Sequence, residues 1–163
     1  MKHILVRRGG IAVSSSPDTW LVARSLGSTL CVCVKDQTAL VSAMTVIVLP
    51  RAPSGIEGDA GLEEVALDAP GGLTRLMRGL MKRGAKRENL NIWLVGAAKF
   101  IEEPSDMALG AQIYTAVRTI LQGNRVMIQG EHVGGQYNRS VKMIAGKAGG
   151  PLVTAPGLRE VSL

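Results

Sequence analysis

The chain has 163 residues, a formal net charge of +6 and 46% hydrophobic residues, a composition that predicts one soluble domain spanning residues 1–163. No apolar run reaches the roughly 18 residues that a membrane-spanning helix needs. The short apolar run near the N-terminus is flanked by charges and is too short for a secretory signal. We therefore expect a cytoplasmic protein without membrane insertion.

Strand signals come first along the chain. Short apolar segments at residues 4–6, 11–13 and 20–22 are separated by turn residues. Residues 29–34 and 40–49 then predict a hairpin whose arms are apolar on both faces, so we expect it to lie between two layers. Cys31 and Cys33 of the first arm lie two apart on one strand face and are expected to be free thiols.

The second half of the chain combines helices with strands. After a long loop, apolar residues at helical spacing predict a helix over residues 73–81, ending at Gly84. A strand, a second helix capped by Ser105 or Asp106, two more strands and one short edge segment follow. The expected strands are 91–98, 125–133 and 139–145, and the second helix ends at Gly123. This order predicts an α+β fold of mixed β-sheets packed with two main helices.

Positive charge concentrates on the first helix and its exit. The residues are Arg75, Arg78, Lys82, Arg83, Lys86 and Arg87. Such a run is typical of a solvated helix face, and the alternative is a basic surface that binds an acidic protein or nucleic acid. Nucleic acid is the less favoured partner because the two Trp, two Tyr and one Phe are scattered singly and form no stacking platform.

Two motifs in the first half of the chain are distinctive: residues 26–36 begin with Leu-Gly-Ser and end at Asp36, and residues 44–50 begin with Met and end in Leu-Pro. They resemble the first signature and the Met-Ala-His-x-x-Leu-Pro arm of the CheD family, the chemoreceptor glutamine deamidases. Residues 83–86, 96–100, 109–111, 131–135 and 139–141 resemble later family elements in the same order. The resemblance implies a CheD-like layered sandwich, and a chemoreceptor or another chemotaxis signalling protein as partner.

The resemblance also assigns the catalytic positions. Deamidation of a glutamine through a thiol acyl-enzyme needs a thiolate, a base and donors for the oxyanion. The family carries these functions on the Cys after Leu-Gly-Ser, the His of the Met-Ala-His arm and a Thr six residues before the Cys. The matching residues here are Thr29, Val46 and Ala23, so the resemblance implies a degenerate, non-catalytic binding or regulatory homologue.

An active enzyme with a displaced nucleophile is the alternative. Cys31 shares a strand face with Thr29 about 6–7 Å further along, and His132 is the candidate base. The competing interpretation is that Cys31 is a small core residue and that His132 has a structural role. We expect no cofactor and no metal site, because two cysteines and two histidines are too few and poorly spaced for zinc.

The glycine pairs give a candidate binding surface. Gly134-Gly135 most simply permits a tight turn between strands. The functional alternative is that this turn holds backbone close to a bound peptide while Arg139 faces a carboxylate or carbonyl. Gly27 and Ser28 can likewise retain backbone N–H donors.

Overall fold

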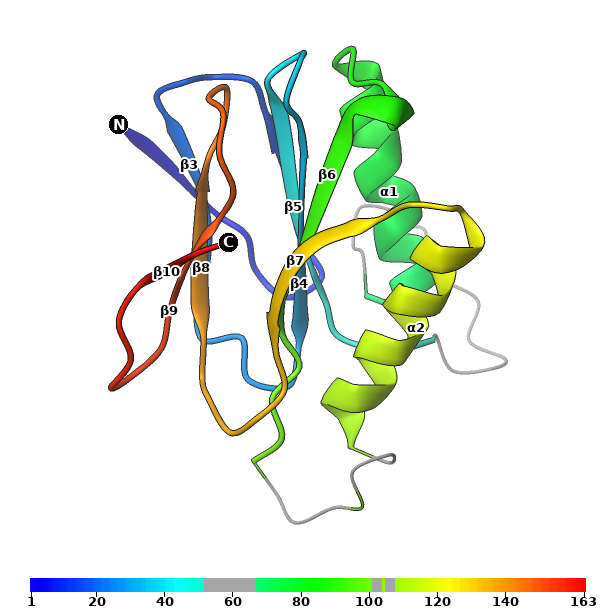
Figure 1. Ribbon diagram of the computed structural model, residues 1–163, viewed down its shortest axis with the longest axis vertical. Coiled ribbons are helices and arrows are strands. Elements are labelled where there is room, and N and C mark those ends of the chain that lie inside the picture. The colour runs from blue at the N-terminus through cyan, green and yellow to red at the C-terminus, as the bar shows by residue number, and fades with distance from the viewer. Residues whose placement is uncertain (52–66, 101–103, 105–107) are drawn as a thin grey trace.

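The chain forms three layers, shown in Figure 1 by the computed structural model, which describes residues 1–51, 67–100, 104 and 108–163. An outer sheet, a central sheet and a pair of helices lie side by side. The outer sheet has the order β1-β3-β8-β9-β10 and the central sheet the order β2-β5-β4-β6-β7. The α+β architecture predicted from the sequence is confirmed.

The elements have the following bounds. The outer sheet contains β1 (Lys2–Leu5), β3 (Thr19–Ala23), β8 (Ser140–Ile144), β9 (Leu152–Thr154) and β10 (Val161–Ser162). The central sheet contains β2 (Ile11–Ser14), β5 (Val41–Ile47), β4 (Leu30–Asp36), β6 (Leu90–Gly96) and β7 (Ile128–Val133). The helices are α1 (Ala69–Lys82), the short 3-10 helix η2 (Arg87–Asn89) and α2 (Leu109–Gly123). Both sheets are mixed, because β1 pairs with β3 and β6 with β7 in parallel while the other pairs are antiparallel.

The β4–β5 hairpin lies between two layers, as its sequence predicts. Every residue of both strands is buried. Alternate side chains serve two cores: Leu30, Val32 and Val34 pack toward the helices, whereas Cys31 and Cys33 pack toward the outer sheet. A strand that is buried on both faces has no room for a polar stripe, which explains why residues 30–34 are apolar without a break.

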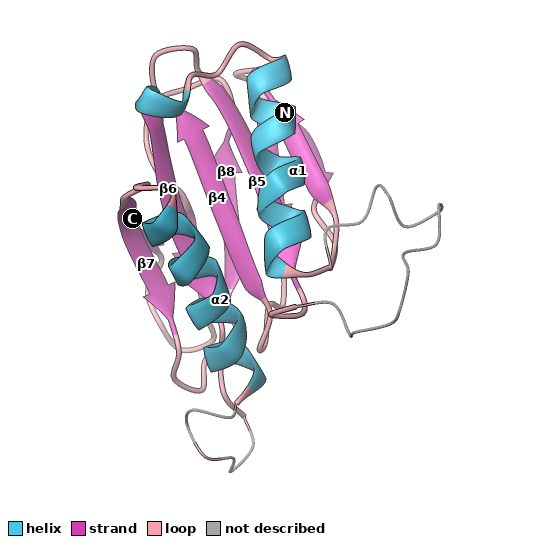
Figure 2. Cartoon of the chain, turned by 90° about the vertical axis from the view of Figure 1, so that its right-hand side faces the viewer, coloured by secondary structure: helices cyan, strands magenta, loops and turns pink. Residues whose placement is uncertain are grey.

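The two helices cover the face of the central sheet that points away from the outer sheet (Figure 2). Helix α1 begins at Ala69 because the Asp68 carboxylate accepts the N–H of Gly71 at 2.8 Å and caps the first turn. Its Leu73, Leu76 and Leu80 point into the core. The spacing of residues 73–81 therefore identified the buried face but not the first turn of the helix.

Other boundaries differ from the sequence-based expectation. Ala108 occupies the N-cap position of α2 and makes no side-chain cap, while the predicted caps Ser105 and Asp106 lie outside the described residues. The C-terminal segment forms two strands, β9 and β10, where one was expected. Most of the long loop predicted over residues 51–68 also lies outside the described residues. Among the described residues, no helix has the length and apolar character needed to span a membrane.

Candidate functional site

Two of the family-like motifs meet at one end of the central sheet. The N–H of Ala97 donates to the carbonyl of Thr29 at 2.8 Å, and the N–H of Ala98 donates to the carbonyl of Gly27 at 3.0 Å. Gly96 has a φ of +121°, and a Cβ there would lie 2.3 Å from the Thr29 oxygen. Only glycine fits this close approach, because the oxygen belongs to backbone and cannot move aside.

The glycine pair after β7 joins the same region. The N–H of Gly134 donates to the Gly96 carbonyl at 3.0 Å, and the Gly135 carbonyl accepts from Lys99 at 2.8 Å. Gly27 donates its N–H to Oδ1 of Asn138 at 3.1 Å. The predicted residues Gly27, Gly134 and Gly135 thus lie in one region. The N–H groups of Gly27 and Gly134 and the carbonyl of Gly135 form hydrogen bonds with other residues of the chain.

Arg139 is buried and connects parts of this region through hydrogen bonds. Its side chain is only 2% exposed, its Nε donates to Nδ1 of His132 at 2.6 Å, and its Nη1 donates to the Gly96 carbonyl at 3.2 Å. Burial and the neighbouring Arg139 charge lower the pKa of His132, so the imidazole is neutral at pH 7. The guanidinium therefore holds His132 and the Gly96 turn in place. The alternative that Arg139 also faces a carboxylate or carbonyl of a bound peptide stays a prediction.

Thr29 and Val46 line one small pocket of about 220 Å³. Thr29 is 4% exposed and its Oγ1 donates to the Leu26 carbonyl at 2.5 Å. Val46 lies opposite Cys31 in the β4–β5 ladder, and Thr29 lies two residues before Cys31, just ahead of β4. Ala23 is not part of the pocket wall but lies in the same buried cluster as Val46.

Three arginines line this same pocket. Arg7 and Arg8 reach it from the connection after β1, and Arg24 reaches it from the connection after β3. These residues were not among the candidate residues derived from the sequence. No local pattern marks them, because the parallel pairing of β1 with β3 is what places the connections after both strands at the same edge of the outer sheet.

Cys31 lies deep between the sheets. The residue is 0% exposed, its Sγ lies 3.8 Å from Sγ of Cys33, and both cysteines are free. Burial, followed by the contact with Cys33, raises the pKa of the Cys31 thiol well above its usual value. Along the ladder Val95 pairs with Cys31 on one side and with His132 on the other, so a valine separates the proposed nucleophile from the proposed base.

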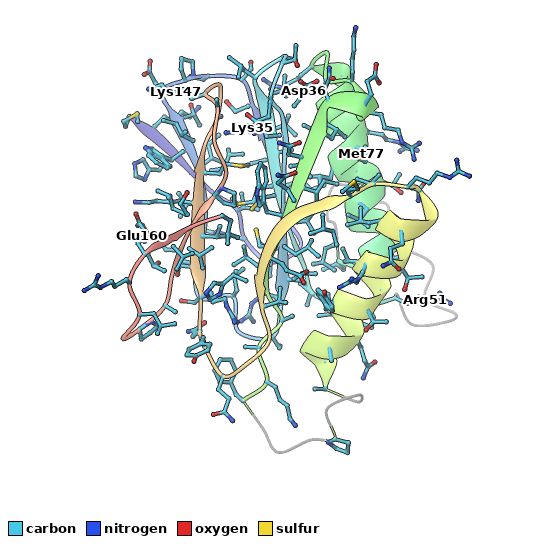
Figure 3. The ribbon with its side chains drawn as sticks, in the orientation of Figure 1. Lys35, Asp36, Arg51, Met77, Lys147 and Glu160 are labelled. Atoms are coloured by element: carbon cyan, nitrogen blue, oxygen red, sulfur yellow. The ribbon has the colours of Figure 1, made fainter. Side chains whose placement is uncertain are left out.

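The basic residues of α1 border a second hollow. Arg78, Lys82 and Arg87 line an apolar groove of about 600 Å³ between the helices, whose walls include Met77 and Ile120. Figure 3 labels Met77 on α1. Arg75 and Arg83, which the sequence placed in the same basic surface, are not among the residues that line the groove.

Lys35 is a buried cation that sequence reasoning did not single out. Its Nζ donates to the carbonyls of Ile144, Lys147 and Gly149 at 2.9, 2.6 and 2.9 Å, which ties the central sheet to the β8–β9 connection (Figure 3). Burial lowers the pKa of Lys35 to about 8, so the ammonium keeps its proton at pH 7. Within the described ranges, no group of three or more His, Cys, Asp or Glu side chains could hold a metal ion.

Comparison with known proteins identifies the family. The family model described as CheD chemotactic sensory transduction matches residues 54–148. The chain belongs to the CheD family. It is similar to the chemoreceptor glutamine deamidase CheD of Thermotoga maritima, with 30% identity over 87% of this chain and 90% of that protein. It is also similar to a probable chemoreceptor glutamine deamidase CheD of Solibacter usitatus, with 29% identity over 90% of this chain and 85% of the relative.

Membership in the CheD family makes the pocket lined by Thr29 and Val46 the candidate functional site. The positions that the motif resemblance assigns to the CheD cysteine and histidine, here Thr29 and Val46, line one opening. A threonine whose hydroxyl donates to the Leu26 carbonyl and a valine without any polar atom cannot form a nucleophile–base pair.

Proposed function

We propose that this chain is a non-catalytic CheD-family protein, which binds a chemoreceptor or another chemotaxis signalling protein at the pocket lined by Thr29 and Val46. The observation that carries the proposal is that these two positions share one pocket although neither residue can perform the family's chemistry. The relatives are named chemoreceptor glutamine deamidases, which is why the proposed partner is a chemoreceptor segment.

Thr29 lacks a partner that could activate its hydroxyl. A threonine hydroxyl needs a base to become nucleophilic at neutral pH, and among the described residues that line the pocket with Thr29 the only titratable side chains are arginines. Arginine stays protonated and cannot accept the proton. The backbone that surrounded the reaction in an active relative is, on this proposal, retained as a docking surface.

The alternative is an active deamidase that uses Cys31 and His132. The raised pKa of the thiol, its complete burial and the intervening Val95 all speak against this pair. His132 Nδ1 is also already occupied by the Arg139 hydrogen bond. The alternative would need a rearrangement that exposes the thiol and frees the imidazole.

A second candidate function is binding of an acidic protein along α1. The groove has apolar walls and a rim of Arg78, Lys82 and Arg87, a combination that fits an amphipathic acidic segment better than nucleic acid. Binding that weakens steeply with salt and with charge reversal at Arg78 and Lys82 would support this function. Salt-independent binding would exclude it.

An ammonia-release assay tests the main proposal. A chemoreceptor cytoplasmic fragment that contains the target glutamines is incubated with this chain and, in parallel, with the Thermotoga maritima relative. The proposal predicts that the fragment binds this chain and that only the relative releases ammonia. Ammonia release by this chain that is abolished by Cys31→Ala would establish the alternative instead.

A further inference from the structure

The pocket lined by Thr29 and Val46 is strongly cationic. Arg7, Arg8 and Arg24 belong to its wall, and none of the described Asp or Glu residues does. The ion pairs Arg118–Glu131 and Lys142–Glu160 involve none of the three arginines, and no described carboxylate forms an ion pair with any of them. Three arginines that line one pocket without an ion-pair partner among the described residues favour an anionic ligand.

The backbone that carries these arginines is fixed on both sides. The N–H of Val6 donates to the Val22 carbonyl at 2.7 Å, and the N–H of Gly9 donates to the Val46 carbonyl at 2.8 Å, so Arg7 and Arg8 lie between two anchors. Two residues after Arg24, the N–H of Leu26 donates to the Arg139 carbonyl at 2.9 Å. The backbone that carries the three arginines is therefore ordered before a ligand binds, which reduces the entropy lost on binding.

The size and lining of the pocket indicate a single side chain as the ligand. A volume of about 220 Å³ is below the roughly 300–1,000 Å³ typical of small-molecule sites. Leu26 and Val46 provide apolar wall for a short aliphatic stem, and the arginines provide donors for an acid at its end. Glutamate has this combination of a short apolar stem and a terminal carboxylate.

The arginines also distinguish glutamate from glutamine. A carboxylate offers two acceptor oxygens to the planar guanidinium fork, and the hydrogen bonds are charge-assisted. A carboxamide is neutral and places its NH₂ donors against the arginine donors. An opening lined by three arginines therefore prefers the acid over the amide.

We propose that this pocket binds the glutamate side chain that glutamine deamidation produces on a chemoreceptor. Hydrolysis of a glutamine amide yields glutamate and ammonia, and the relatives carry the name of that reaction. The inference rests on the proposed function, since it names the ligand of the same non-catalytic pocket. On this proposal, the chain binds the product of the reaction for which its relatives are named.

The test compares two forms of one receptor fragment. The glutamine form is used as purified, and the glutamate form is made by treatment with the Thermotoga maritima relative and repurified. Dissociation constants are measured for both forms with this chain at low and high salt. We expect the glutamate form to bind at least about tenfold more tightly, with a preference that shrinks as salt rises.

Charge variants test whether the three pocket arginines cause the preference for the glutamate form. The triple variant Arg7→Gln/Arg8→Gln/Arg24→Gln should bind the two forms equally. All three side chains are exposed, so their replacement should leave the core unchanged. The control Arg78→Gln/Lys82→Gln/Arg83→Gln removes the same net charge from α1 and should keep the preference.

The outcomes separate this inference from the function on which it rests. Equal affinity for the two forms, or a preference that survives in the pocket variant, would overturn the glutamate assignment alone. No binding of either form would overturn both the glutamate assignment and the proposed binding of a chemoreceptor. Tighter binding of inorganic phosphate than of the glutamate form, measured in a competition arm with phosphate and free glutamate, would also overturn it. Ammonia release from the glutamine form would instead overturn the non-catalytic function.

Discussion

Arg139 donates a hydrogen bond from Nε to Nδ1 of His132, with 2.6 Å between the two nitrogens. This contact keeps a neutral imidazole beside a buried cation, and it joins β7 to the segment that precedes β8. The Arg139 carbonyl in turn accepts from Leu26, next to the pocket. One residue thus couples the glycine turn, the Leu-Gly-Ser segment and the imidazole.

The first prediction concerns the titration of His132. Burial and the Arg139 charge lower its pKa in the folded state, whereas the unfolded chain keeps a value of about 6.5. The unfolded state therefore takes up this proton first as the pH falls, so stability is complete above about pH 6.5 and declines below it. NMR titration should show a midpoint below 6.5 for His132, and a midpoint at or above 6.5 would show that Arg139 does not face the imidazole as described.

Replacing Lys35 tests the contact between the two sheets. Lys35→Met should reduce the free energy of unfolding by about 2–4 kcal/mol, because the carbonyls of Ile144, Lys147 and Gly149 lose their buried donor. The pKa of about 8 lies below the unfolded value of about 10.4, so this group makes the folded state relatively more stable as pH rises between those values. Urea unfolding at pH 7 and pH 9.5 should show that the variant lacks this increment, and an unchanged pH dependence would contradict the burial of the ammonium.

A pair of glycine variants separates backbone strain from steric clash. Gly96→Ala should destabilise the fold by about 3 kcal/mol or more, because its Cβ would lie 2.3 Å from the Thr29 carbonyl oxygen. Gly134→Ala is the matched control, since Gly134 also has a positive φ but a Cβ there meets nothing within 4 Å. The control should cost only about 1 kcal/mol, and equal losses in thermal unfolding would argue against the close approach of the two motifs.

Thiol labelling tests the state of the cysteines. Both Cys31 and Cys33 are buried, and burial raises the pKa of Cys31, so a thiol reagent at pH 8 should leave the native protein unlabelled over the time in which a denatured sample reacts fully. Fast labelling of native protein that disappears in Cys31→Ala would show an accessible thiolate and would favour the enzyme.

The parts of the fold that depend on local pattern were predictable. Residues 30–34 are apolar at every position on both faces, which correctly placed the β4–β5 hairpin between layers, and the spacing of Leu73, Leu76 and Leu80 correctly gave the buried face of α1. The start of α2 was not predictable, because Ala108 makes no side-chain cap and because Gly110 lies so close to Ala97 that a Cβ there would be 2.7 Å from the Ala97 carbonyl oxygen.

The site was predictable only where a motif marks it. The Leu-Gly-Ser and Met44–Pro50 resemblances pointed to Thr29 and Val46, which line one pocket. Arg7, Arg8 and Arg24 carry no such mark, since their meeting depends on the parallel pairing of β1 with β3, which places the connections after both strands at one edge of the outer sheet. The burial of Arg139 was likewise invisible in the sequence, because an arginine after a glycine turn is more often exposed.

The central claim is that the family scaffold persists here without its reacting groups, and restoring those groups tests it most directly. The variant Ala23→Thr/Thr29→Cys/Val46→His rebuilds the set that the family resemblance assigns to these positions, and release of ammonia from a glutamine-bearing receptor fragment is measured beside the unmodified chain. The account predicts release by the variant and none by the unmodified chain. Release by the unmodified chain at a rate comparable to the variant would contradict it.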